Sequence, residues 1–382
     1  MQEIFYAVGL DVDKVTFKAC LKMRKSSAKS TVRATRTFSN NREGFKELEQ
    51  WIKKHQTFKD STVRIILEAT GVYHEHLAWH LYQQGHQLHV IVPLRARRYM
   101  QSLGNKSKND KVDAQGLADM CLQQELALWQ PCSKNILLLR SLTRQLQTLQ
   151  ETRTVFRNQL ESATHLANCD RMVIRNLKSL IKTIESDIGN LKMRIEKFIR
   201  EDQQLHDKYK LVQPIKGFAI ITFATLVAET GGFELFENQK QLVSYAGYDV
   251  TENQSGKRIG KTRISKQGNT HIRRIMHMAS FNVVRYQVTP FVQLYSRVYE
   301  RTKTKMKAYV AVQRKLLCLI YALWKNDSVF NPQYSGNIEP ETQLSVSLDP
   351  QTKVATNNRV ATLDELPMIN HLKSSFQCNK LL

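Results

Sequence analysis

The sequence contains little that would indicate disulfides, zinc or a membrane. Its six cysteines are scattered over 382 residues, with no CxxC pair and no Cys/His spacing of the zinc type. We therefore expect free thiols in a reducing cytoplasm. No apolar run approaches the length of about 18 residues that a membrane span requires, and no cationic stretch precedes an apolar one at the start. We expect no membrane partner, no span and no signal peptide.

Acidic residues are also scarce. The chain has 57 Lys and Arg but only 34 Asp and Glu, which gives a net charge of +23. Because such an excess of one sign causes self-repulsion in a compact protein, a polyanionic partner is expected. There is no basic amphipathic helix with an aromatic face, so nucleic acid is favoured over a membrane. On charge alone, a structural role of the ribosomal type stays open.

The first 130 residues alternate between strand-like and helix-like patterns. Residues 6–14 predict a buried strand that ends near Asp11, and residues 63–68 predict another that ends in Glu68. Strands that alternate with helices indicate an α/β sheet, and functional groups gather at the carboxyl ends of such strands. RNase H-like nucleases place their first metal ligand in this way, although a single acid at a strand end is more often an ordinary turn residue.

Two further acids begin a predicted helix. Asp110 and Asp113 are three residues apart and share one face of its first turn. A helix cap with a favourable dipole charge would account for one acid, but not for two among Lys106, Lys108 and Lys111. We therefore expect a role in metal binding.

The four carboxylates together suit a hard divalent cation. Carboxylate oxygens favour Mg²⁺ or Mn²⁺ over zinc. Two such ions about 3.5–4 Å apart would stabilise the attacking and the leaving oxygen of a phosphoryl transfer. The residues thus predict a metal-dependent nuclease or phosphoryl transferase whose basic surface holds nucleic acid.

The middle of the chain is helical. In residues 131–210, apolar residues recur at spacings of three and four, which predicts a coiled-coil helical hairpin that turns within about residues 167–175. We expect this insertion to be a spacer or a dimerisation arm.

Residues 211–330 form a third predicted unit that is mostly helical. Lys216 and Gly217 lie in a segment typical of a helix-hairpin-helix, whose turn can bind a phosphate, although a plain helical turn fits equally well. Residues 253–274 contain seven basic residues and no acid, with glycines between them, which predicts a phosphate-binding loop that contacts nucleic acid. The basic residues are Lys257, Arg258, Lys261, Arg263, Lys266, Arg273 and Arg274. Residues 331–382 are expected to be a polar, partly disordered tail.

Four segments resemble blocks of one known family. GLDVDK from residue 9, LEATGVYHEHLAWHL from residue 67 and KNDKVDAQGLA from residue 108 are similar to the N-terminal blocks of DEDD-type insertion-sequence transposases with a RuvC-like domain. LVSYAGYDVTENQSGKRIGKTRISKQGNTHIRRIM, from residue 242, is similar to their C-terminal transposase block. The resemblance spans about residues 4–290, and residues beyond 331 have no part in it.

The resemblance implies a specific chemistry. It assigns a catalytic metal-binding tetrad to Asp11, Glu68, Asp110 and Asp113. It assigns the nucleophile to Ser255, which would attack the scissile phosphate, assisted by the metals and by Lys257 and Arg258. It further implies a dimer or tetramer that acts on element ends and target DNA near the nucleoid, guided by a structured bridge RNA, with Ser255 supplied by another subunit.

Two alternatives accompany this interpretation. A Holliday-junction-type endonuclease would need the four acids and a basic surface, but no serine nucleophile. A nucleic-acid-binding protein without catalysis would need only the basic surface.

Overall fold

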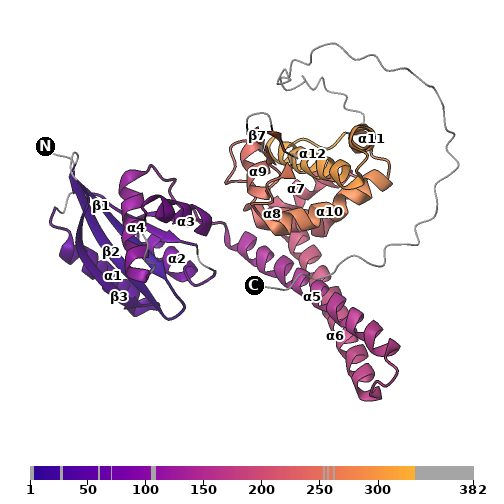
Figure 1. The fold of residues 1–382 in the computed structure, drawn as a ribbon, viewed down its shortest axis with the longest axis horizontal. Helices are drawn as coiled ribbons and strands as arrows, with labels where there is room; N and C mark the ends of the chain where they lie inside the picture. Colours follow the sequence, from indigo (N-terminus) through magenta and orange to yellow (C-terminus); the bar gives the residue numbers. More distant parts are fainter. Residues whose placement is uncertain are drawn as a thin grey trace, which may run out of the picture. The chain divides into compact units, whose positions relative to one another are not determined.

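The computed structural model describes residues 4–331, except 26–28, 59–60, 70, 105–108, 253, 256–257 and 261–262. The predicted tail lies outside the described residues from residue 332 onward. The same holds for four lysines named above: Lys106, Lys108, Lys257 and Lys261. The N-terminal part of the chain contains a sheet, and the part after residue 133 is mostly helical (Figure 1). None of the described helices is long and apolar enough to cross a membrane.

The sheet is mixed and has the strand order β3-β2-β1-β4-β5. Its strands are β1 (Ile4–Val12), β2 (Thr16–Lys25), β3 (Thr31–Ser39), β4 (Val63–Glu68) and β5 (Gln87–Ile91). The first three strands form an antiparallel meander, and β4 and β5 add to it in parallel with β1. An antiparallel meander extended by parallel strands is the RNase H-like arrangement, so the predicted fold class is confirmed.

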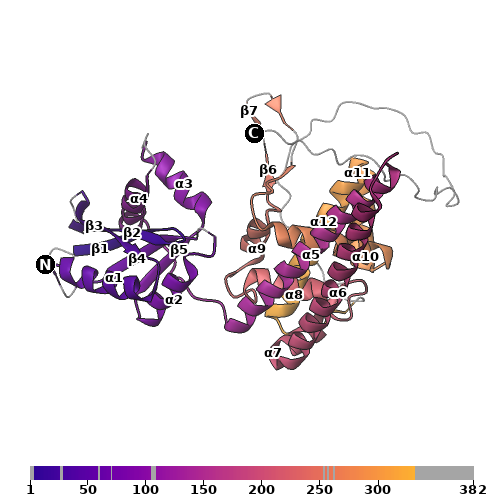
Figure 2. The same ribbon diagram turned by 90° about the horizontal axis from the view of Figure 1, so that it is seen from below.

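Helices cover both faces of this sheet. They are α1 (Arg42–His55) and α2 (Glu75–Gln83) on one face, and α3 (Pro93–Ser102) and α4 (Asp110–Gln123) on the other (Figure 2). Side chains of a strand alternate between the faces, so Val8 packs with α1 and α2 whereas Ala7 packs with α3 and α4. Because both faces are buried, β1 is apolar almost without interruption until Asp11.

The predicted helical hairpin is present. It consists of α5 (Lys134–His165) and α6 (Arg171–Glu201), which pack against each other. The turn occupies residues 166–170 and ends earlier than predicted, because Asp170 caps α6 by accepting a hydrogen bond of 2.7 Å from the backbone N–H of Met172.

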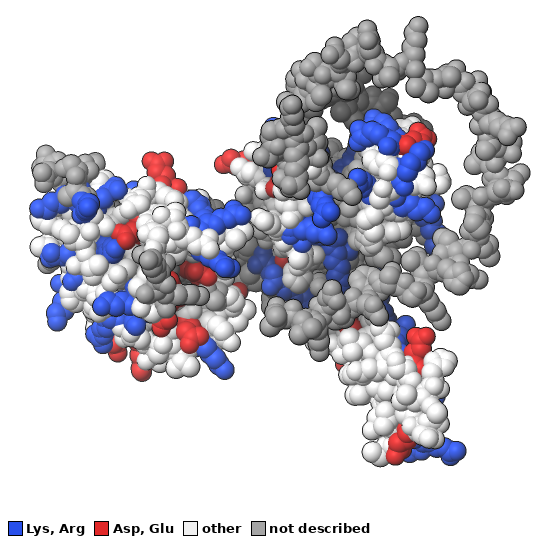
Figure 3. All heavy atoms as spheres, in the orientation of Figure 1, with Lys and Arg blue, Asp and Glu red and all other residues white. Residues whose placement is uncertain are grey.

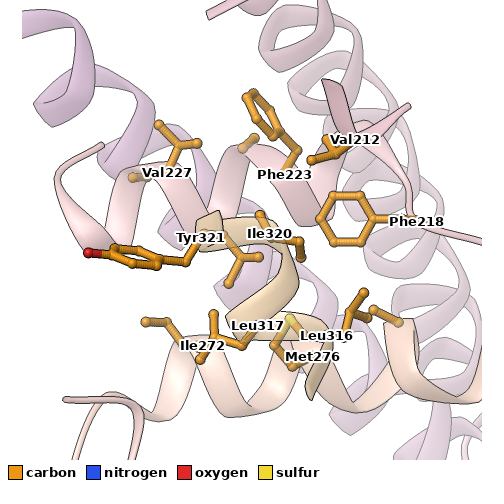
Figure 4. Packing of buried hydrophobic residues seen from close by; sticks show 14 of the residues in the cluster. Val212, Phe218, Phe223, Val227, Ile272, Met276, Leu316, Leu317, Ile320 and Tyr321 are labelled. Atoms are coloured by element: carbon orange, nitrogen blue, oxygen red, sulfur yellow. The ribbon is translucent and has the colours of Figure 1, made fainter. Parts of the chain in front are cut away.

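The remaining helices share one core with the base of this hairpin. They are α7 (Gln203–Val212), α8 (Ile220–Thr230), α9 (Gln239–Ala246), α10 (Thr270–Arg285), α11 (Thr289–Thr302) and α12 (Lys305–Lys325). Figure 4 shows Phe223 of α8, Met276 of α10 and Ile320 of α12 among the residues of this core. The buried cluster runs from Ile136 to Phe330, so it does not break near residue 210. The apolar faces of α5 and α6 pack against α8 as well as against each other.

The basic, glycine-containing segment forms a β-hairpin where the sequence indicated a loop. Its outer ladder pairs β6 (Val250–Thr251) with β9 (Arg263–Ile264), and its inner ladder pairs β7 (Gln254–Ser255) with β8 (Arg258–Ile259). Branched residues in three of these short strands favour extended backbone, which explains the difference. β6 and β7 extend away from α9 in Figure 2.

Candidate active site

Asp11 and Glu68 lie next to each other on neighbouring strands. β1 and β4 are parallel, and Leu10 is in register with Leu67. Asp11 and Glu68 are the next residues of the two strands, and both are half-buried. Alternation along each strand directs the two side chains to the face that α4 covers. The two acids therefore lie together at one edge of the sheet, with Lys18 of β2 opposite Asp11.

Gly9 allows α4 to lie directly on β1. A Cβ atom at this position would be 2.5 Å from the backbone nitrogen of Ala118 and closer still to the carbonyl oxygen of Ala114. Backbone atoms of a packed helix cannot move aside as the end of a flexible side chain can. The absence of a side chain at Gly9 thus sets the height of α4 above the strand that carries Asp11.

A buried ion pair fixes the direction of α4. Lys22 of β2, which is only 8% exposed, donates to Asp119 over 2.5 Å, and Ser30 donates to the other oxygen of that carboxylate over 2.6 Å. Lys22 lies opposite Ala7, whereas Ala114 lies over Gly9. The helix therefore runs antiparallel to β1, and its first turn lies toward the end of the strand where Asp11 is found.

That first turn carries Asp110 and Asp113. Asn109 caps the helix by accepting a hydrogen bond of 2.9 Å from the backbone N–H of Val112. Capping therefore requires neither acid, so a role as helix cap does not explain Asp110. Asp110 is exposed and Asp113 is half-buried.

The four acids share one edge of the sheet without forming a tight cluster. Among the described residues, no three Asp, Glu, His or Cys side chains lie close enough together to hold a metal ion. Carboxylates of like charge repel one another, so a cation is the natural agent to draw them together. A set made only of carboxylate oxygens suits Mg²⁺ or Mn²⁺.

Asn40 connects the two loops that follow these strands. Its side-chain nitrogen donates to the carbonyl oxygen of Asp13 over 2.8 Å and to that of Tyr73 over 3.1 Å. One loop follows Asp11 and the other follows Glu68. No pattern in the sequence indicated this role, because it depends on two loops that lie far apart in the chain.

Ser255 belongs to the helical part of the chain. It lies on β7 and pairs with Arg258. The base of this hairpin is held by backbone hydrogen bonds of 2.7 Å from Ser265 to Asp249 and of 3.1 Å from Lys266 to Gly247. Among the described residues, no buried cluster includes both the sheet and the helical part, so the acids and Ser255 stand on separate cores.

A buried carboxylate lies beneath the base of the hairpin. Glu229 of α8 is 2% exposed and accepts hydrogen bonds of 2.8 and 3.0 Å from Arg144 of α5. Asn269, which caps α10 just after the hairpin, also donates to this carboxylate over 2.8 Å. Burial alone would raise the pKa of Glu229, but the bonds from Arg144 and Asn269 outweigh it and lower the pKa. A single acid within the apolar run of α8 was the overlooked sequence signal.

The predicted nucleic-acid contacts differ in accessibility. Lys216, Arg263 and Lys266 are exposed. Arg273 is half-buried and donates to the carbonyl oxygen of Ala246 over 2.8 Å. Arg274 is exposed, and its side chain pairs with Glu151.

Gly217 shapes the turn between α7 and α8. It has a φ of +89°, and a Cβ atom there would be 2.9 Å from backbone and side-chain atoms of Asn282 on α10. The predicted helix-hairpin-helix segment is thus packed against α10 at its glycine.

Comparison with known proteins gives the same assignment for both parts of the chain. A transposase family model matches residues 8–168. The model of the transposase IS116/IS110/IS902 family matches residues 209–296.

Full-length relatives are also similar. The chain is 30% identical to the pilin gene-inverting protein of Moraxella bovis over 325 residues, which cover 85% of this chain and 97% of that protein. Its Moraxella lacunata counterpart matches equally well, and a probable family 20 transposase of Pseudomonas aeruginosa is 21% identical over 58% of this chain and 71% of that protein. Among solved structures, Thermus thermophilus RuvC with a Holliday junction overlaps 30% of this chain and 90% of its own, at 8% identity and a TM-score of 0.23. The matched models and the near-complete alignment with the pilin gene-inverting proteins show that this chain belongs to the IS116/IS110/IS902 family of transposases, enzymes that cut and rejoin DNA.

Proposed function

We propose that Ser255 attacks the scissile phosphate of DNA while Asp11, Glu68, Asp110 and Asp113 hold divalent cations beside it. The serine oxygen forms a bond to phosphorus, the bond from phosphorus to the leaving sugar oxygen breaks, and that oxygen takes up a proton as the serine loses one. The resulting phosphoserine diester retains the energy of the broken link, so a second sugar hydroxyl can rejoin the strand. Mg²⁺ or Mn²⁺ would polarise the phosphate and stabilise the developing charge.

The observation that carries this proposal is the register of β1 and β4. It places Asp11 and Glu68 side by side at the carboxyl edge of the sheet, toward which the first turn of α4 lies. Arg258 pairs with Ser255 across the inner ladder, and we propose that it supplies a cation to the reaction. The exposed Arg263 and Lys266 at the base of the hairpin would bind the DNA backbone.

The partners follow from the same features. The net charge of +23 suits both element and target DNA and a structured guide RNA. Because the acids and Ser255 stand on separate cores, we propose that a dimer or tetramer completes each active site, with Ser255 from one subunit and the acids from another.

Replacing Ser255 with alanine is expected to eliminate the covalent protein–DNA adduct while DNA binding persists, because only the nucleophilic oxygen is removed. Denaturing electrophoresis of labelled DNA incubated with the protein measures the adduct. Ser244→Ala is a matched control, since Ser244 is exposed on α9. Cleavage that survives Ser255→Ala without an adduct would identify an endonuclease of the Holliday-junction type instead.

Asp11→Asn is expected to abolish cleavage and to weaken the stabilisation that Mg²⁺ or Mn²⁺ gives to the sheet. A ligand at a hundred times its dissociation constant stabilises the folded state by about 2.7 kcal/mol, so thermal melting with and without Mn²⁺ reports binding independently of activity. Asp13→Asn is the control, because Asp13 is exposed and only its backbone carbonyl oxygen accepts from Asn40. Unchanged melting and unchanged DNA processing in Asp11→Asn would favour a non-catalytic binding protein.

A further inference from the structure

Five aromatic rings form a continuous row across α10, α11 and α12. Tyr299 stacks on Tyr295 with ring centres 6.0 Å apart, and Tyr295 contacts Tyr309 at 4.7 Å. Tyr309 stacks on Phe281 at 3.8 Å, and Phe281 meets His277 edge-on at 4.9 Å. All five are half-buried, so the row lies at the surface of the helical core. We call these residues the aromatic row.

A strong positive charge surrounds the row. Residues 285–325 contain nine Lys and Arg and a single acid, Glu300. Five exposed cations lie on α11 and where α12 begins: Arg297, Arg301, Lys303, Lys305 and Lys307. None of them takes part in an ion pair among the described residues. Figure 3 shows Lys and Arg gathered at the end of the helical part where α11 lies in Figure 1.

The placement of the lysines is unfavourable for the helix that carries them. Lys303 ends α11 with a left-handed backbone at a φ of 51°, and α12 begins two residues later. The first turn of α12 contains Lys305 and Lys307 and no acid, and Thr304 provides no side-chain cap. Cations at a helix N-terminus oppose the helix dipole. A local rule that is broken in this way is expected at a functional or strained site, and clustered cations would attract an anion.

We propose that the aromatic row and the cations of the α11–α12 corner bind unpaired nucleotides of a single nucleic-acid strand. Phosphates alone would satisfy the lysines, but they would not use the ring faces at this surface. Ring faces at a basic surface offer stacking to bases, which must be unpaired to reach them. Tyr299 ends the row, and it has only Tyr295 as a ring neighbour among the described residues, so its other face is the position for the first base.

This inference rests on the proposed function in that nucleic acid is the partner. It extends that function to a site that neither cleaves DNA nor belongs to the serine hairpin. The strand could come from a loop of the guide RNA or from DNA opened during strand exchange. Both present the same chemistry of bases and phosphates.

The test measures binding of labelled oligouridylate, oligothymidylate and a duplex, each about 20 nucleotides long, by fluorescence anisotropy. The full-length chain carries Asp11→Asn so that cleavage cannot interfere. Tyr299→Ala is expected to weaken binding of at least one single strand about tenfold and to leave duplex binding unchanged. Tyr299→Phe retains the ring and should bind as the parent does.

A second variant tests the cations. Replacing Lys303, Lys305 and Lys307 with glutamine should reduce the slope of log affinity against log salt by about 0.7 per lost phosphate contact, roughly two in total for a single strand. Tyr82→Ala is the control for the tyrosine variant, because Tyr82 is exposed, lies outside the aromatic row and contacts Trp79 and Trp129 on another part of the chain.

Two results would overturn the inference. One is single-strand binding by Tyr299→Ala that equals the parent, and the other is an equal loss for single strands and duplex. A preference of the parent for oligouridylate would identify the guide RNA as the source, and a preference for oligothymidylate would identify DNA. The adduct assay on Ser255 is independent of this binding, so either proposal can fail without the other.

Discussion

Gly9→Ala is expected to eliminate DNA cleavage and to destabilise the sheet by about 1–3 kcal/mol, the usual cost of overpacking a core. The added methyl group would overlap the backbone of α4 at Ala114 and Ala118. To avoid this overlap, the whole of α4 must move away from β1. Asp110 and Asp113 would then leave their positions above the edge that carries Asp11.

Cleavage assays combined with urea unfolding distinguish this effect from simple loss of fold. A protein that retains native circular dichroism at low urea but does not cleave would confirm that the height of α4 matters for the chemistry. Gly189→Ala is the control, and its expected change in stability has the opposite sign. Gly189 lies within α6 with nothing within 4 Å of the added methyl group, so alanine there should stabilise the helix by about 0.5–1 kcal/mol. Normal cleavage and normal unfolding by Gly9→Ala would contradict the packing argument.

Arg144→Met is expected to destabilise the helical part by about 3 kcal/mol. It removes the charged partner of a carboxylate that is almost fully buried, and an uncompensated buried charge is costly. Because Arg144 itself is half exposed, the reverse change Glu229→Gln should cost less: the arginine left behind can be solvated. Urea unfolding monitored by helical circular dichroism measures both.

Arg157→Met on the same helix is the matched control. Its pair with Glu185 has both side chains exposed, at 56% and 40%, so the loss should be below about 1 kcal/mol. Equal losses of stability in Arg144→Met and Arg157→Met would show that the Arg144–Glu229 pair contributes no more than an exposed pair.

The pH dependence of stability provides an independent check on Glu229. Its pKa in the folded protein is lowered, so its contribution is complete above the ordinary glutamate value near 4.5 and disappears as the pH falls through the lowered pKa. Glu229→Gln should therefore lose this part of the acid sensitivity. A parent and a variant with parallel stability curves below pH 4.5 would contradict the assignment.

The sequence predicted features that depend on local patterns. The strands that end in Asp11 and Glu68 follow from apolar runs closed by an acid, and the α5–α6 hairpin follows from its apolar spacing. Features that need two distant segments were not accessible. Asn40 connects two loops, Glu229 depends on Arg144 of another helix, and the aromatic row joins three helices.

Differences of detail had local causes. The cap that could have accounted for one acid of α4 is Asn109 instead, because an asparagine side chain can also accept the N–H of Val112. The segment around Ser255 looked like a loop because glycines and cations hide a few branched residues, each of which pairs across a short ladder.

The Lys22–Asp119 pair has a consequence for how this protein can change over evolutionary time. A slip of α4 by one turn, about 5.4 Å, would keep most apolar contacts but would leave a buried ammonium group and a carboxylate without each other. The pair therefore disfavours a position of α4 that is shifted by one turn, and α4 carries Asp110 and Asp113. A lineage that loses Lys22 while retaining Asp119 would bear the cost of an unpaired charge, so the two positions should change together, most readily to a pair of apolar residues.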